Sequence, residues 1–258
     1  MIEYAIICLV ALAASALTLF SGFGLGTLLL PAFLVFFAPP IAVAMTAVVH
    51  FANNLAKLGL VGRLADRTVV RRFGVPAMLA SIVGAGLLAT LSRREPLASY
   101  QLFGRHHDVT LIGVVVGSLI ALFAFWEASP RLSRVSFSPR YLPIGGALSG
   151  FFGGLSGHQG ALRSAFLIRS GLSKEAYIGT GVIIACLVDA ARLAIYGREI
   201  GFGAVRDEWR LAAAAVVAAV VGAFAGARLL PSVSMRFVRR VTTVLLFMVA
   251  VAIAAGLT

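Results

Sequence analysis

One long stretch without charged residues constrains this chain most: no Asp, Glu, Lys or Arg occurs between Tyr4 and Ala56. Such a stretch exceeds the ~20 apolar residues that one membrane crossing needs. Across the chain, 60% of the residues are hydrophobic, 12% are charged and the mean hydropathy is +0.99. Soluble domains carry about 25% charged residues. These properties predict an all-α polytopic membrane protein.

The net charge of +12 comes from basic residues that lie between the apolar spans rather than in clusters with aromatic residues. This distribution favours contact with membrane lipids and a role in topology, and it argues against nucleic-acid binding. The two cysteines, Cys8 and Cys186, fall inside apolar spans and lack metal-ligand spacing. The chain has no Walker-type loop and no nucleophile elbow. We therefore predict no enzyme, no cofactor and no metal.

Two glycine clusters interrupt the apolar spans at related places in the two halves. The first is Ser21-Gly22-Phe23-Gly24-Leu25-Gly26-Thr27, and the second runs from Ser149 to Gly160. Gly disfavours a helix interior by ~1 kcal/mol relative to Ala, so each cluster predicts a helix break. In lipid, the freed backbone groups must face protein or a cavity. Paired interrupted segments indicate a transporter binding site, whereas the alternative for either cluster is close helix packing through small residues.

The distribution of basic residues distinguishes two topologies. If each cluster separates two full crossings, the loop Lys and Arg residues divide ten against nine. If each cluster is the tip of a re-entrant hairpin, they divide thirteen against six. The positive-inside rule expects a bias, so we predict hairpins, with the thirteen-residue side in the cytoplasm and both termini periplasmic. The length of Tyr4–Phe20 would also allow a full crossing, which leaves the first topology open.

Hairpins at both clusters give each half three crossings and therefore predict two inverted repeats in one membrane domain. Repeat 1 covers residues 1–126, with a hairpin over 4–37 and helices over 41–63, 73–91 and 109–126. Residues 127–140 form the connecting loop. Repeat 2 covers 141–258, with a hairpin over 141–171 and helices over 174–196, 210–230 and 237–257.

The two predicted tips have the chemistry of an anion site. A short helix that starts at each tip would present unpaired N–H groups and the positive end of its dipole to a ligand. Arg163 would add a guanidinium that binds oxyanions through two parallel hydrogen bonds, unless it lies shallower and reaches water. His158 and Gln159 could supply further donors, although a histidine in a turn often makes only local hydrogen bonds. The predicted substrate-binding residues are Ser21, Gly22, Phe23, Gly24, Gly26, Thr27, Asn53, Asn54, Ser156, Gly157, His158, Gln159, Gly160 and Arg163.

A polar stripe at helical spacing marks the apolar span Ile41–Val61, and it predicts a face that lines a pathway or bonds to neighbouring helices. Its members are Thr46, His50, Asn53, Asn54 and Lys57. Lys57 has the alternative of extending to the cytoplasmic surface. In the second half, Asp189 and Arg192 are three residues apart and can pair on one helix face.

Arg192 falls near the pseudo-equivalent of Lys57, which predicts one basic residue toward each mouth of a central path. His50 is a candidate proton-linked group because histidine titrates near neutral pH. We assign five residues to the pathway or to ion coupling: Thr46, His50, Lys57, Asp189 and Arg192.

One set of motifs occurs in both halves. The first half carries Ser21-Gly22-Phe23-Gly24-Leu25-Gly26, Leu28-Leu29-Leu30-Pro31, Pro39-Pro40 and Ala44-Met45-Thr46. The second half carries Gly153-Gly154-Leu155-Ser156-Gly157 through Gly160, then Leu172-Ser173-Lys174-Glu175-Ala176 and Gly179-Thr180. At these residues the chain resembles the sulfite exporter TauE/SafE family.

The resemblance implies an inner-membrane transporter of sulfite, thiosulfate, organosulfonates or related small anions. In the predicted fold, the anion would bind between the two tips and alternating access would move it across the membrane. The alternative is a membrane-embedded accessory or assembly protein without transport activity. The sequence leaves open the anion, the direction of transport, the coupling ion, and whether the protein is a homodimer.

Overall fold

The computed structural model describes residues 2–21, 25–102, 104–199, 207–229 and 235–257 of the 258-residue chain. The first half contains α1 (Ile2–Ser21), α2 (Leu25–Leu34), α3 (Pro39–Val61), α4 (Arg67–Val69), α5 (Val75–Ser92) and α6 (Leu111–Ala128). The second half contains α7 (Leu142–Ser156), α8 (Gly160–Leu167), α9 (Lys174–Glu199), α11 (Trp209–Leu229) and α12 (Met235–Ala254). Short helical turns join them: η1 (Gly62–Leu64), η2 (Val70–Gly74), η3 (Leu132–Arg134) and η4 (Pro139–Tyr141).

Local sequence signals explain where several helices begin. Pro39 and Pro40 open α3, where a fixed φ suits the first turn and the missing N–H needs no partner. Thr110 precedes α6, and its side chain accepts a hydrogen bond from the Gly113 N–H at 3.1 Å. Tertiary packing rather than capping holds α2 and α8, which have only ten and eight residues.

Within the described residues, four helical segments are long and apolar enough to cross a membrane: Pro39–Leu64, Arg67–Ser92, Leu111–Ala128 and Lys174–Glu199. By contrast, α2 and α8 are far shorter than the ~20 residues of a full crossing. The chain is therefore a multi-pass membrane protein in which two short helices stop within the protein.

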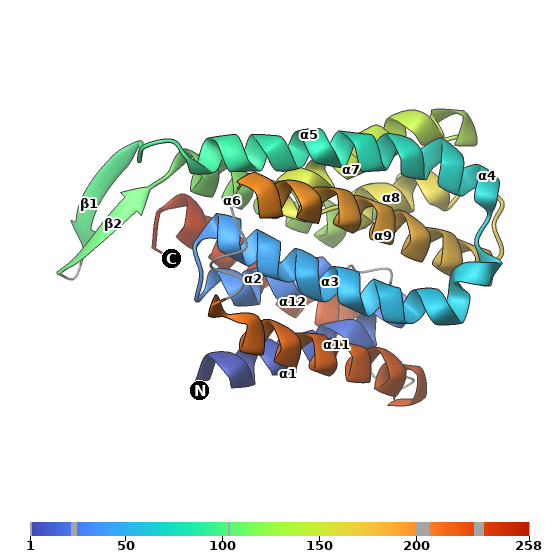
Figure 1. The fold of residues 1–258 in the computed structure, drawn as a ribbon, viewed down its shortest axis with the longest axis horizontal. Coiled ribbons are helices and arrows are strands. Elements are labelled where there is room, and N and C mark those ends of the chain that lie inside the picture. Colours follow the sequence, from blue (N-terminus) through green and yellow to red (C-terminus); the bar gives the residue numbers. More distant parts are fainter. Residues whose placement is uncertain (1, 22–24, 103, 200–206, 230–234, 258) are drawn as a thin grey trace.

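The two halves interleave rather than forming separate domains. Helix α1 packs against α11, and α5 packs against α7. The remaining main pairs are α3 with α9 and α6 with α12. Each of these pairs joins one half of the chain to the other, and α3, α5 and α9 lie side by side in Figure 1.

Glycines on one face of α7 bring that helix into backbone contact with the segment containing α5. A Cβ atom on Gly146, Gly150 or Gly154 would overlap a backbone carbonyl oxygen, that of Phe73, Ala77 or Ser81 respectively. For this part of the second cluster, the packing alternative is therefore correct. Helix α7 continues to Ser156, and the break is confined to residues 157–159, where Gly157 has a φ of 78°.

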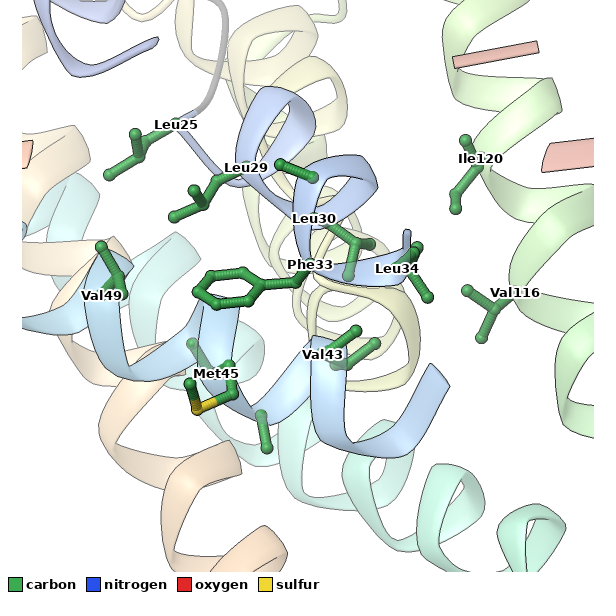
Figure 2. Close-up of a cluster of buried hydrophobic side chains, with 14 of the residues drawn as sticks. Leu25, Leu29, Leu30, Phe33, Leu34, Val43, Met45, Val49, Val116 and Ile120 are labelled. Atoms are coloured by element: carbon green, nitrogen blue, oxygen red, sulfur yellow. The ribbon is translucent and has the colours of Figure 1, made fainter. Parts of the chain in front are cut away.

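The short helix α2 is buried on nearly every side. Figure 2 shows its side chains Leu30, Phe33 and Leu34 among Val43 and Met45 of α3, with Val116 and Ile120 of α6 close to Leu34. All of these side chains belong to one hydrophobic core cluster. This packing fixes the position at which α2 begins, next to the second helix break.

An antiparallel β-hairpin, which the sequence analysis did not predict, joins α5 to α6 and projects from one end of the molecule (Figure 1). It consists of β1 (Ala98–Leu102) and β2 (Arg105–Val109). The Tyr100 hydroxyl donates to the carbonyl oxygen of Ala255 at 2.6 Å, and His107 Nδ1 lies 3.1 Å from that of Gly256. These contacts hold the C-terminal end of α12 against the hairpin, and the N-terminus lies toward the same end of the molecule (Figure 1).

Candidate anion site between the two helix breaks

The two glycine clusters, far apart in the sequence, meet in space. A Cβ atom on Gly26 would lie 3.4 Å from the carbonyl oxygen of Gly157 and 3.8 Å from Cγ2 of Thr46. The start of α2, the turn before α8 and the middle of α3 therefore converge. Thr27 is buried beside Gly26. Of the other predicted first-tip residues, Gly22, Phe23, Gly24 and the side chain of Ser21 lie outside the part that the structure describes.

A buried charge network lies next to this junction. His50 Nδ1 is 2.6 Å from Oδ2 of Asp189, and Arg192 donates to Asp189 Oδ1 through Nε at 2.9 Å and Nη2 at 2.7 Å. The ion pair predicted from the spacing of Asp189 and Arg192 is confirmed. The contact with His50 was not predicted, because its partner lies 139 residues away in the sequence.

Arg192 also binds the backbone of the second tip. Its Nη1 donates to the carbonyl oxygen of Gly153 at 3.0 Å, and the Tyr196 hydroxyl donates to that of Gly154. Arg192 is only 1% exposed, so the prediction that it lies toward a mouth of the pathway is wrong: this guanidinium holds the C-terminal end of α7. Sequence reasoning missed Tyr196, because its partner is a backbone carbonyl that leaves no sequence signal.

The turn at the second tip is held by its own hydrogen bonds. The Ser149 hydroxyl donates to the carbonyl oxygen of Gln159 at 3.0 Å. The Ser156 hydroxyl donates to the carbonyl oxygen of Phe152 at 3.1 Å. His158 Nδ1 lies 3.0 Å from the Ser156 carbonyl oxygen and its ring stacks on Phe123. Because a carbonyl only accepts, neutral His158 carries its proton on Nδ1 and offers an acceptor at Nε2. This contact is the local hydrogen bond that the sequence left open as the alternative role of His158.

Several polar atoms near the junction are buried and have no hydrogen-bond partner within the described residues. They are Oγ1 of Thr46, Nε2 of His158, both amide atoms of Gln159 and Nη1 of Arg163. A buried polar group without a partner costs about 1–3 kcal/mol. Their grouping along the second tip and the facing part of α3 therefore indicates a place where a polar ligand or water completes the hydrogen bonding.

The remaining polar residues of the α3 stripe are Asn53, Asn54 and Lys57, and their side chains make hydrogen bonds within the protein. The Asn53 amide, oriented with its nitrogen toward the acceptors, donates to Ala219 O at 3.3 Å and accepts from Lys57 Nζ at 3.0 Å. The side chain of Asn54 donates to the His50 carbonyl oxygen at 2.9 Å. Asn53 thus joins α3 to α11, whereas the hydrogen bond of Asn54 lies within α3, and Lys57 turns toward Asn53.

Arg163 lies in the first part of α8 and faces α9. Its Nε is 3.8 Å from the position that a Cβ on Gly181 would occupy. Its charge interacts with that of Lys57 on α3 and with that of Asp189 on α9. Arg163 therefore lies within electrostatic range of both Lys57 on α3 and Asp189 on α9.

Comparison with known protein families settles the class of this protein. The model of the sulfite exporter TauE/SafE family matches residues 7–253, a range that runs from within α1 to within α12 and spans both helix breaks. The chain belongs to this family. No curated protein and no solved structure gave a significant match. As a TauE/SafE family member with four helices able to cross a membrane, the protein is a membrane protein of a transporter family for sulfur anions.

Proposed function

We propose that the protein exports sulfite, thiosulfate or a related organosulfonate from the cytoplasm across the inner membrane. The observation that carries this proposal is the junction of the two helix breaks, where Gly26 faces Gly157, and shortly after Gly157 along the chain Gln159 and Arg163 carry buried polar atoms without a partner in the described residues. Membership of the TauE/SafE family supports the class of substrate.

Three kinds of donor would hold the anion at this junction. The N-termini of α2 and α8 supply backbone N–H groups and the positive ends of two helix dipoles. The Gln159 amide supplies a neutral donor. The Arg163 guanidinium supplies charge and a planar fork that matches the oxygens of a sulfonate or sulfite group. Thr46, His50 and Lys57 would line the approach along α3.

We infer that the two halves are inverted repeats that rock against each other to alternate access. The reciprocal helix pairs, α1 with α11 and α5 with α7, support this arrangement. The two short helices and the thirteen-to-six division of basic residues support re-entrant hairpins and periplasmic termini. A reporter fused to the C-terminus that is active only outside the cytoplasm checks this orientation; an inactive reporter on a functional protein would contradict it.

Export by this route needs no coupling ion. Moving one negative charge outward gains ~2.3 kcal/mol per 100 mV of inside-negative potential. Uptake would need a coupled ion, and His50 with Asp189 would be the group to bind a proton in that case. We therefore assign the network of His50, Asp189 and Arg192 a primary role in holding the second tip in place.

The experiment is a flux assay in proteoliposomes with sulfite, thiosulfate and sulfoacetate. We expect Arg163→Ala to lower anion flux about 10- to 100-fold, because a charged hydrogen bond contributes about 1.5–3 kcal/mol. Arg169→Ala removes an exposed arginine just beyond α8 and serves as the matched control with unchanged flux. Full flux in Arg163→Ala would remove Arg163 from the site. No flux of any anion in the wild type would favour an accessory or assembly role instead.

A further inference from the structure

The contact between His50 and Asp189 lies close to the junction of the two helix breaks. On α3, His50 comes one helical turn after Thr46. Residues spaced by four lie on the same face of a helix, with their Cβ atoms about 5–6 Å apart. Cγ2 of Thr46 is 3.8 Å from the position that a Cβ on Gly26 would occupy. His50 therefore lies about one helical turn from the point where Gly26 meets Gly157.

Arg192 connects the same contact to the second helix break. Its Nε and Nη2 atoms donate to Oδ1 of Asp189 at 2.9 Å and 2.7 Å, and Nδ1 of His50 is 2.6 Å from Oδ2. Its Nη1 atom donates to the carbonyl oxygen of Gly153 at 3.0 Å. The same Nη1 atom lies 3.4 Å from the position that a Cβ on Gly157 would occupy. A continuous set of buried contacts therefore runs from His50 to the second break.

The charge of this network depends on the protonation state of His50. When His50 is neutral, the carboxylate of Asp189 and the guanidinium of Arg192 cancel each other. An ionised carboxylate only accepts hydrogen bonds, so Nδ1 of His50 carries a proton in both states and an additional proton binds at Nε2. Asn54 presents a neutral amide to that atom, with Nδ2 at 3.3 Å. Uptake of the proton therefore adds one positive charge to a buried network beside the junction.

The other titratable or charged groups around the network keep their charge state at mildly acidic pH. Those that interact electrostatically with Asp189 or Arg192 are Arg163 on α8, Cys186 and Tyr196 on α9, and His158 at the second tip, and Lys57 lies two turns beyond His50 on α3. Between about pH 5.5 and pH 7, lysine and arginine remain charged, whereas cysteine and tyrosine remain neutral. The histidines are the side chains of this set that titrate in that range.

We propose that His50, Asp189 and Arg192 form a proton site linked to the anion site, so that the protein binds its anion more tightly when His50 is an imidazolium. The proposal rests on the proposed function, because it assumes that the anion binds at the junction. A positive charge about one helical turn from a buried anion attracts it more strongly than it would in water. By linkage, the bound anion strengthens proton binding by the same factor. The linkage concerns binding and holds for transport in either direction.

Thiosulfate is the probe for the test, because it stays fully ionised at these pH values and any pH dependence comes from the protein. Titration calorimetry on the full-length protein in detergent, at constant ionic strength, would measure its affinity at about pH 5.5 and about pH 7. We expect the wild type to bind thiosulfate at least about fivefold more tightly at the lower pH. Repeating the titration in buffers with different ionisation enthalpies should show that the protein takes up protons as the anion binds.

Removal of the imidazole should abolish both effects. We expect His50→Gln to bind thiosulfate with the same affinity, within about twofold, at both pH values and without proton uptake. The control His106→Gln removes an exposed histidine of the β-hairpin and should keep the wild-type pH dependence. A wild type without pH dependence, or a His50→Gln variant that retains it through His158 or another group, would overturn the proposal.

The wild type alone decides the matter if His50→Gln does not fold. In nitrogen NMR of histidine-labelled protein at a fixed pH, with signals assigned from variants of the other histidines, thiosulfate should move the His50 signals toward those of an imidazolium. Unchanged His50 signals at saturating thiosulfate would contradict the linkage. If thiosulfate neither binds nor is transported at any pH, the proposed function is wrong. If it is transported and binds equally well at both pH values, only the linkage is wrong.

Discussion

At the scale of single residues, Asp189 links the two halves of the protein. It joins His50 of the first half to Arg192, which in turn binds the backbone of α7 at Gly153. The carboxylate is fully buried, so removal of its charge leaves a buried guanidinium without a counter-ion. Such a loss is far more costly than the loss of a surface pair.

This difference can be measured by comparing two conservative substitutions. We expect Asp189→Asn to lower the free energy of unfolding by about 3–5 kcal/mol, as for other broken buried ion pairs. Glu199→Gln breaks the more exposed pair with Arg93, at 3.0 Å, and should change stability by at most about 1 kcal/mol. Thermal unfolding of both variants in detergent provides the measurement. Similar transition temperatures for the two variants would contradict a central role for the Asp189 network.

The sequence was informative at this scale only where partners are close along the chain. The spacing of three residues was enough to predict the pair of Asp189 and Arg192. The contact between His50 and Asp189 depends on how α3 packs against α9, and that packing leaves no local pattern. Backbone partners, such as the carbonyl oxygens that Tyr196 and Arg192 bind, are equally hidden in a single sequence.

At the scale of elements, the glycine-rich helix α7 both packs closely against its neighbour and leads directly into a helix break. Gly146, Gly150 and Gly154 recur every fourth residue and bring its backbone against the segment containing α5. Only after Ser156 does the chain break, at Gly157. The sequence left two interpretations open for this cluster, a helix break and close packing through small residues, and spacing of small residues by four is the known pattern for helix contact.

Because Gly150 packs against α5 and Gly86 does not pack against any atom, alanine substitutions at the two positions should have different effects on stability. A Cβ atom on Gly150 would overlap the carbonyl oxygen of Ala77, so Gly150→Ala should destabilise the protein by about 1–3 kcal/mol or more. Gly86 on α5 has no atom within 4 Å of its Cβ position. Gly86→Ala should therefore leave stability unchanged or raise it. Size-exclusion profiles and thermal unfolding in detergent would measure the stability of both variants. Equal stability of the two variants would contradict the close packing of α7 against the segment containing α5.

At the scale of the whole molecule, the pairing of helices ties both halves to one central junction. The apolar spans and the sparse charges predicted the membrane class, because hydrophobic matching to lipid acts on every residue of a span. The meeting of Gly26 with Gly157 could only be inferred from the similarity of the two halves. The β-hairpin of β1 and β2 was missed, because the short polar segment around Arg105 shows none of the strong turn signals between two apolar strands.

The transported anion should bind where the two helix breaks meet. A structure determined with thiosulfate at a concentration that saturates transport would test this binding site. We expect density for the anion between Gly26 and Gly157, within hydrogen-bonding distance of the Arg163 guanidinium. Density for the anion elsewhere in the membrane domain, with this junction filled by protein or water alone, would contradict it.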